Sequence, residues 1–299
     1  MAWWQWGDPR SAHVVVCVHG LTRQGRDFDA LAQALVARAG GDVRVVCPDI
    51  AGRGESDWLR DPQQYQLPRY AADVLTMLSQ LAREQPLLML DYVGTSMGGL
   101  IGIALAGNRE APLPVPIRRF VINDVGPTLD PVALQRIGTY VGLGGRYASF
   151  DQAADALWAL SPTFGPHSRA QWQALSRHMV VPASQRSADG ASKLPATAGS
   201  ETAFPLVLHY DPAIALPLHA VTAEAIAEGE AVLWGLYDGI TAETLVTRGA
   251  QSDLLSAATA AAMTRRGPRA RLVEFEGVGH APTFVAPDQI AAVTGFVFG

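Results

Sequence analysis

The 299-residue sequence lacks the basic clusters that are typical of nucleic-acid-binding proteins and the long apolar runs that are typical of membrane proteins. Lysine is nearly missing, since Lys193 is the only one, and the formal net charge is −5. No cluster of Lys and Arg reverses that balance, which argues against a nucleic-acid-binding surface. No apolar run approaches the roughly 20 residues that a membrane-spanning helix needs. These absences exclude a basic nucleic-acid binder and an integral membrane protein.

Cysteine is also scarce: the only two, Cys17 and Cys47, each lie in an apolar, strand-like run. We interpret both as buried small hydrophobic residues rather than as parts of a disulfide framework. The first eight residues, Met-Ala-Trp-Trp-Gln-Trp-Gly-Asp, lack the basic start and the long apolar segment of a signal peptide. We therefore expect a soluble, cytoplasmic protein without a membrane span.

Buried strands alternate with amphipathic helices in both end regions of the chain, a pattern typical of an α/β fold with a parallel, doubly wound sheet. Apolar runs predict strands over residues 2–6, 13–18, 43–47, 87–92, 119–122, 244–248 and 271–276. Helical spacing predicts helices after Asp27, which is the expected N-cap, and from about Arg69, Leu100, Ser256 and Asp288. In such sheets the chemistry gathers at the carboxyl ends of the strands.

The alternation stops between about residues 128 and 235, where helical patches dominate and no strong strand run appears. We predict a core made of residues 1–127 and 236–299, with residues 128–235 inserted as an all-helical cap. Residues 182–206 are rich in Ala, Ser, Gly and Pro with little periodicity, and we interpret them as a mobile loop of the cap.

The central motif is Val93-Gly94-Thr95-Ser96-Met97-Gly98-Gly99, which lies between a predicted strand and a predicted helix. A strand, G-x-S-x-G and a helix together predict a nucleophile elbow, a sharp turn that lifts a serine hydroxyl clear of the sheet. The turn requires a positive φ at Ser96, and glycines at 94 and 98 remove the Cβ atoms that would collide. Because G-x-S-x-G alone is a weak signal, the rest of the chain must supply the groups that activate the serine.

A serine nucleophile needs a base, and the base needs a carboxylate that orients it. His280 lies on a Gly-rich loop after the last predicted core strand, and we predict it as the base. Asp253 lies just beyond the strand at 244–248, and we predict it as the acid, because Ser, Asp, His is the expected chain order. Asp124, just past the strand at 119–122, is the alternative acid.

The oxyanion that forms when a serine attacks a carbonyl needs two N–H donors. The N–H of Met97 follows the nucleophile directly, and the N–H of Leu21 follows His19-Gly20 at the end of a strand. We predict these two groups as the oxyanion hole.

Other polar clusters have simpler interpretations. Asp49, Glu55 and Asp57 share one loop, but no His or Cys at metal-ligand spacing accompanies them. We interpret them as groups that tie down the loop and predict no metal site. Gly142-Leu143-Gly144-Gly145 follows no strand and lacks the phosphate-loop spacing, which predicts an ordinary loop of the cap.

Taken together, the motifs resemble the α/β-hydrolase fold superfamily, and within it the capped bacterial esterase-like serine hydrolases. The similarity covers nearly the whole length, through His19-Gly20, residues 49–56, residues 94–99, the Asp253 turn and Gly279-His280. The resemblance implies a Ser96/Asp253/His280 triad, an acyl-enzyme intermediate, no cofactor, and a cap that shapes the substrate pocket.

The implied function is a serine hydrolase that cleaves carboxylic esters of small or medium acyl groups. Ser96 stands where dehalogenases and epoxide hydrolases of this fold carry Asp, and Ala281 stands where meta-cleavage C–C hydrolases usually carry Trp. A lactonase or a C–C bond hydrolase with the same triad is an alternative, and a ligand-binding, receptor-like relative is a remoter one. We expect a small-molecule ester or lactone substrate and no nucleic-acid partner, and the sequence indicates no oligomeric state.

Overall fold

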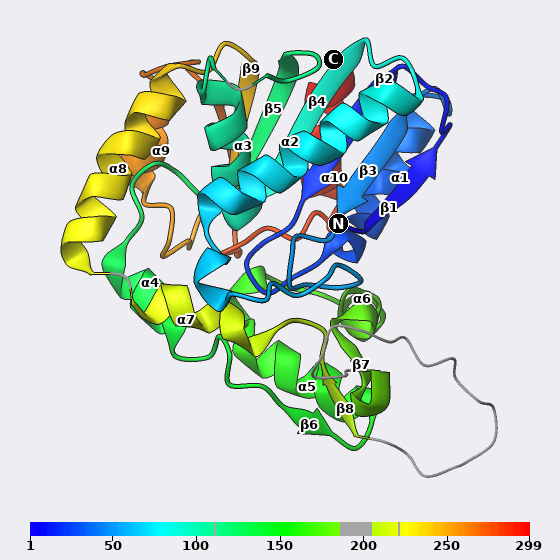
Figure 1. Ribbon diagram of the computed structural model, residues 1–299, viewed down its shortest axis with the longest axis vertical. Helices are drawn as coiled ribbons and strands as arrows, with labels where there is room; N and C mark the ends of the chain where they lie inside the picture. The colour runs from blue at the N-terminus through cyan, green and yellow to red at the C-terminus, as the bar shows by residue number, and fades with distance from the viewer. Residues whose placement is uncertain (111, 186–204, 221) are drawn as a thin grey trace.

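The computed structural model describes residues 1–110, 112–185, 205–220 and 222–299, and its centre is a seven-stranded sheet (Figure 1). The strand order is β1-β3-β2-β4-β5-β9-β10. Strand β1 is antiparallel to β3, and every other neighbouring pair is parallel, which confirms the predicted fold class. The strands are β1 (Trp3–Gly7), β2 (His13–Val18), β3 (Arg44–Pro48), β4 (Met89–Thr95), β5 (Ile117–Asn123), β9 (Glu243–Gly249) and β10 (Arg271–Phe275).

Strand β2 shows why helices must cover both faces of the sheet. Val14, Val16 and Val18 belong to one buried cluster, whereas Val15 and Cys17 belong to another. Successive side chains of a strand point to opposite faces, so a run of five buried residues requires an apolar layer on each side. Helices α1 (Asp29–Arg38) and α10 (Pro287–Phe298) form one layer, and α2 (Leu67–Glu84) and α3 (Met97–Gly107) form the other (Figure 1).

The first helix begins differently from the prediction. Helix α1 starts at Asp29, and the N-cap position is occupied by Phe28, which makes no side-chain capping bond. Asp27 lies in the preceding short 3-10 helix η1 (Gly25–Phe28), and its carboxylate binds the guanidinium of Arg23 instead of capping α1. An ion pair to a side chain four residues earlier therefore replaces the expected cap.

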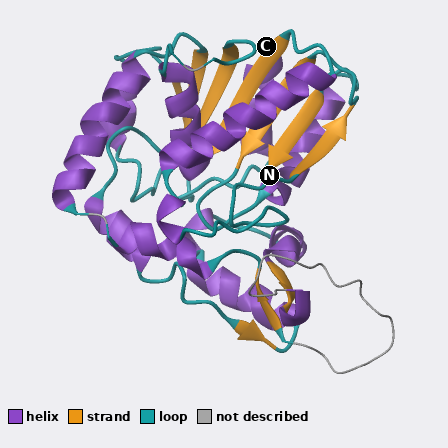
Figure 2. Cartoon of the chain, viewed as in Figure 1, coloured by secondary structure: helices purple, strands orange, loops and turns teal. Residues whose placement is uncertain are grey.

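The region after β5 contains a small sheet as well as helices, which corrects the prediction of an all-helical insertion. Antiparallel strands pair in the order β6-β8-β7 beside the helices (Figure 2). These strands have two or three residues each, too few to produce an alternating sequence pattern. The elements are α4 (Pro131–Gly138), β6 (Arg146–Tyr147), α5 (Phe150–Leu160), α6 (Arg169–Ser176), β7 (Val180–Pro182), β8 (Leu206–Leu208) and α7 (Ala215–His219).

Helix α8 (Ala223–Asp238) packs against α3, at the end of the region predicted as the cap. The contact is so close that a Cβ on Gly107 would collide with the carbonyl oxygen of Leu236. Helix α9 (Ala257–Met263) then follows β9. The division into residues 1–127 with 236–299 and residues 128–235 stays a prediction.

The loop predicted over residues 182–206 lies mostly outside the described residues, which omit 186–204. Its two described ends are joined, because Pro182 of β7 pairs with Leu206 of β8. Cys17 and Cys47 are both buried and free, as interpreted from the sequence. Within the described ranges, no helix is long and apolar enough to cross a membrane.

Candidate active site

The turn between β4 and α3 places Ser96 at the carboxyl end of the central strand. Strand β4 ends at Thr95 and α3 begins at Met97, so Ser96 alone makes the turn, with φ 53° and ψ −117°. This is the positive φ that an elbow requires, and it is strained for a residue with a Cβ. A Cβ on Gly94 would collide with the carbonyl oxygen of Gly98, and one on Gly98 with that of Val18. The two glycines are therefore a steric requirement of the turn.

Three side chains from distant parts of the chain form a hydrogen-bonded relay. Ser96 Oγ lies 3.0 Å from His280 Nε2, and His280 Nδ1 lies 2.7 Å from Asp124 Oδ2. If Nδ1 carries the ring proton and donates it to the carboxylate, Nε2 is left to accept from the serine hydroxyl. The relay has the order of groups that activates a serine as a nucleophile.

The carboxylate of Asp124 is completely buried and well satisfied by donors. Besides the His280 ring, it accepts bonds from the backbone N–H of Gly249 at 2.8 Å and from Ser252 Oγ at 2.6 Å. Asp124 itself directly follows β5, and Gly249 ends the neighbouring strand β9. The sheet therefore supplies both the acid and one of the donors that fix it.

The predicted acid, Asp253, does not contact His280, and this prediction is wrong. Its carboxylate forms a two-pronged ion pair with Arg136 of α4, with bonds of 2.8 and 3.0 Å, and its side chain is 42% exposed. Asp253 lies four residues beyond the end of β9, which carries it away from the sheet edge, whereas Asp124 is the first residue after β5. The alternative acid, Asp124, is the one that the structure brings to His280.

The predicted oxyanion donors, Leu21 and Met97, both contact the guanidinium of Arg53. Arg53 Nε donates to the Leu21 carbonyl at 2.8 Å, and Nη2 lies 3.8 Å from Met97 Sδ. Among the described residues, neither the N–H of Leu21 nor that of Met97 has a hydrogen-bond acceptor. Both N–H groups are thus available for a ligand oxygen, and their role as an oxyanion hole stays a prediction.

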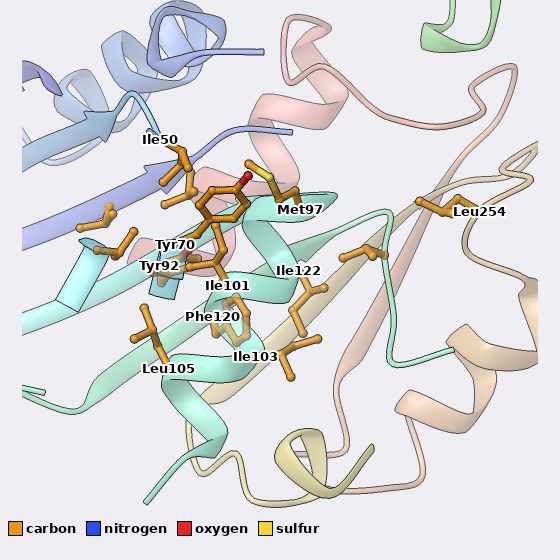
Figure 3. Close-up of a cluster of buried hydrophobic side chains, with 14 of the residues drawn as sticks. Ile50, Tyr70, Tyr92, Met97, Ile101, Ile103, Leu105, Phe120, Ile122 and Leu254 are labelled. Atoms are coloured by element: carbon orange, nitrogen blue, oxygen red, sulfur yellow. The ribbon is translucent and has the colours of Figure 1, made fainter. Parts of the chain in front are cut away.

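Arg53 itself has no counterpart in the sequence-based expectations for the site. It is fully buried, and Nη1 donates to the Ala51 carbonyl at 2.7 Å and to the Tyr70 hydroxyl at 2.9 Å. Tyr70 and Met97 are labelled in the apolar cluster that borders this end of α3 (Figure 3). The loop motif at residues 49–56 was visible in the sequence, but a buried charge with backbone partners has no sequence signature.

His19 holds the turn that carries Leu21. Its Nε2 accepts the backbone N–H of Ile50 at 3.0 Å, so its Nδ1 donates to the Gly20 carbonyl at 2.7 Å. The pKa of His19 is lowered to about 3, mainly by complete burial and also by the positive charges of Arg53 and Arg23, while the bond to the Gly20 carbonyl opposes the shift. His19 is therefore a neutral, fixed strut under the turn at ordinary pH.

The region predicted as the cap reaches the loop that carries His280. Thr163 Oγ1 donates to the His280 carbonyl at 2.7 Å, and the Thr163 carbonyl accepts the N–H of Gly279 at 2.6 Å. Of the aromatic residues of this region, Trp172 is buried and donates to the Ala154 carbonyl, while Trp158 packs edge-on against it. Phe164 follows Thr163 and borders a cavity beside the relay.

The acidic loop at Asp49 is a structural tie, as interpreted from the sequence. Asp49 accepts bonds from the N–H groups of Gly25 and Glu55 and from Trp4 Nε1. Burial raises the pKa of Asp49, and these donors oppose that rise. Within residues 1–110, 112–185, 205–220 and 222–299, no group of three His, Cys, Asp or Glu side chains could hold a metal ion.

Comparison with known proteins adds to this geometry. Residues 15–293 match the model of the alpha/beta hydrolase family. The chain is 46% identical over 299 residues to the 3-hydroxybutyrate-oligomer hydrolase of Cupriavidus necator, which covers 100% of this chain and 93% of that protein. It is 25% identical over 288 residues to the 2-(acetamidomethylene)succinate hydrolase of Mesorhizobium japonicum, covering 96% and 88% of the two chains. An alpha/beta hydrolase structure from Novosphingobium aromaticivorans superposes with a TM-score of 0.76 and 34% identity, covering 99% and 92%.

Proposed function

Because the chain belongs to the alpha/beta hydrolase family, we propose that it is a serine hydrolase that cleaves carboxylic esters of small or medium acyl groups. One observation carries the proposal: Ser96 Oγ, His280 and Asp124 are linked by bonds of 3.0 and 2.7 Å, with Ser96 and Asp124 at the carboxyl ends of the adjacent strands β4 and β5. Such a relay removes the hydroxyl proton as the serine attacks a carbonyl carbon.

In the first half of the reaction, Ser96 Oγ forms a bond to the ester carbonyl carbon while His280 Nε2 takes its proton. Asp124 keeps the ring in the required tautomer and stabilises the imidazolium that forms. His280 then gives the proton to the leaving alcohol oxygen, and the acyl group stays on Ser96. In the second half, a water molecule attacks the acyl-enzyme, with His280 again acting first as base and then as acid.

The negative charge on the carbonyl oxygen is assigned to the N–H groups of Leu21 and Met97. Their lack of acceptors among the described residues supports this assignment. Removal of one such donor typically costs 10²–10³ in turnover. Arg53 and His19 hold the two donor-bearing turns, so we assign them a positioning role.

For the substrate, we propose esters of short β-hydroxy acids, such as oligomers of 3-hydroxybutyrate. The support is the 46% identical relative, whose name states that it hydrolyses such oligomers, and its near-complete coverage of both chains. A lactone or a bond between two carbons would use the same three groups, so a substrate panel is needed to separate these alternatives. High turnover of 3-hydroxybutyrate oligomers with low turnover of lactones is the expected result.

The test is the Ser96→Ala variant, assayed on p-nitrophenyl butyrate and on 3-hydroxybutyrate oligomers. We expect turnover of both to fall about 10⁴-fold or more, because the nucleophile is gone. Ser79→Ala is a matched control, since Ser79 Oγ only donates to the Leu75 carbonyl within α2. Hydrolysis that persists in Ser96→Ala would refute the proposed function.

A further inference from the structure

A small cavity adjoins the relay on the side of the turn that carries Leu21. Its volume is about 40 Å³, and it is bounded by Gly20, Thr95 and Ala281, which are neighbours of the oxyanion turn, Ser96 and His280 respectively. Arg23, Phe164 and Leu175 also line the cavity. A space of this size is large enough for a polar group of a substrate.

Arg23 is held rigidly at this cavity. Its Nε donates to Asp27 Oδ2 at 2.6 Å, and its Nη2 donates to Asp27 Oδ1 at 2.8 Å and to the Leu175 carbonyl at 3.0 Å. These bonds use every N–H of those two nitrogens. The guanidinium is thus fixed in place before any ligand arrives, which lowers the entropic cost of binding.

The third nitrogen, Nη1, has no hydrogen-bond partner among the described residues. Within that part of the chain, Ser176 Oγ is the only fully buried side-chain nitrogen or oxygen without a partner. Nη1 of Arg23 therefore keeps accessible surface, and neither of its two N–H groups donates to a group of the described residues.

Arg23 and the proposed nucleophile border the same space. A Cβ placed on Gly20 would lie 3.7 Å from Ser96 Cβ and 3.9 Å from Arg23 Cγ. The stem of Arg23 and Ser96 Cβ therefore lie on either side of the same point beside Gly20. A second oxygen in the substrate would then find donors that are already oriented.

The charge at the cavity selects the kind of oxygen. Arg23 is paired with Asp27, so together they carry no net charge, and both side chains are mostly buried. A carboxylate bound here would leave one negative charge uncompensated in a poorly hydrated site, which is costly. An uncharged carbonyl or hydroxyl oxygen would accept the Nη1 hydrogen bonds without that cost.

We propose that Arg23 forms a subsite for a second, uncharged oxygen of the substrate, in the hydroxy-acid unit next to the scissile ester. The inference rests on the proposed ester hydrolysis and deepens it: the enzyme selects oxygen-bearing esters over plain alkyl esters. Asp27 positions Arg23 and neutralises it.

The test compares two substrates in two variants. One substrate is the methyl ester of the linear 3-hydroxybutyrate dimer, and the other is an alkyl ester of the same backbone length without the additional oxygens. In Arg23→Met we expect the ratio of their kcat/KM values, dimer over alkyl ester, to fall about 10- to 100-fold, the effect of losing a hydrogen bond from a charged donor. Arg26→Met is the matched control, because Arg26 pairs with Asp29 and stacks on Trp4 away from the cavity. It should leave the ratio unchanged.

Arg23→Lys covers the case in which the methionine variant does not fold. Lysine retains a charge for Asp27 but lacks the Nη1 donors, so the same fall in the ratio is expected. A ratio equal to that of the unmodified protein in a folded, fluorophosphonate-reactive variant would overturn the inference. An equal loss on both substrates would overturn it as well, because it would mean a purely structural role.

Asp27→Asn tests the charge argument separately. Without the compensating carboxylate, Arg23 should favour an anion, so the preference for the free-acid dimer over its methyl ester should rise severalfold. An unchanged preference would refute the selection of uncharged oxygens. Failure of this subsite would leave Ser96-dependent hydrolysis intact, whereas failure of the proposed function would appear as hydrolysis that survives Ser96→Ala.

Discussion

Substitution of the two candidate acids, one at a time, gives the sharpest test of the proposed relay. Asp124→Asn keeps the size and shape of the side chain but removes its charge. It changes a fully buried group that accepts bonds from Gly249, Ser252 and His280. Asp253→Asn makes the same chemical change at a side chain that is 42% exposed and bound to Arg136. Comparison of the two variants therefore separates the effect of removing the charge next to His280 from the effect of removing a charge elsewhere on the protein.

The expected magnitudes differ by orders of magnitude. An amide beside His280 no longer stabilises the imidazolium and imposes the wrong tautomer of the ring. The same replacement in the catalytic triad of a serine protease lowers kcat about 10⁴-fold. Weakening the three bonds to Asp124 also costs about 1–3 kcal/mol of stability. The exposed pair of Asp253 is worth about 0–1 kcal/mol, and turnover should stay within about twofold.

The assay is steady-state hydrolysis of p-nitrophenyl butyrate, with urea unfolding of each variant as the stability control. Asp124→Asn should lose about 10⁴ in kcat while remaining folded, and the double variant should match Asp124→Asn. A large loss in Asp253→Asn with nearly full activity in Asp124→Asn would refute the assignment of the acid.

Three further outcomes follow from the same geometry. Ser252→Ala removes the 2.6 Å bond to Asp124 and should lower kcat about 10-fold. Ser252→Thr keeps the hydroxyl and should restore kcat. An equal loss of kcat in both variants would contradict a positioning role for Ser252. The pKa of His19 is about 3 in the folded protein and about 6.5 in the unfolded chain, so the free energy of unfolding falls by about 1.4 kcal/mol per pH unit as pH drops between these values. In urea unfolding, the free energy of unfolding of His19→Gln should therefore decline less between pH 6 and pH 4 than that of the unmodified protein. An equal decline in both proteins would contradict this prediction. Gly98→Ala should destabilise the fold by about 3 kcal/mol or more because of the collision with Val18, whereas Gly229→Ala in α8, with open space around it, should stabilise by about 0.4–1 kcal/mol in the same thermal melts.

Much of the fold was predictable because its signals are local. The apolar run at 13–18 predicted β2 with the bounds it has, and the other core strands and helices were placed within a few residues. The elbow was equally readable, because Gly94 and Gly98 flank Ser96 in the sequence, although the Val18 carbonyl that a Cβ on Gly98 would meet lies far away in the chain. The short strands β6, β7 and β8 were missed, because two or three residues are too few to show an alternating pattern.

The sequence by itself predicted the sheet, and it singled out Ser96 and His280, whose Oγ and Nε2 the structure places 3.0 Å apart. It could not decide between Asp124 and Asp253 as the acid, because each follows a strand. Only the tertiary contacts of a carboxylate show whether it reaches the His280 ring. The tertiary structure decided this: β5 lies between β4 and β9, so the first residue after β5 meets the His280 loop, while Asp253 extends to Arg136. The open donors of Arg23 were likewise invisible in the sequence, because they are defined by the bonds that Asp27 and Leu175 already occupy.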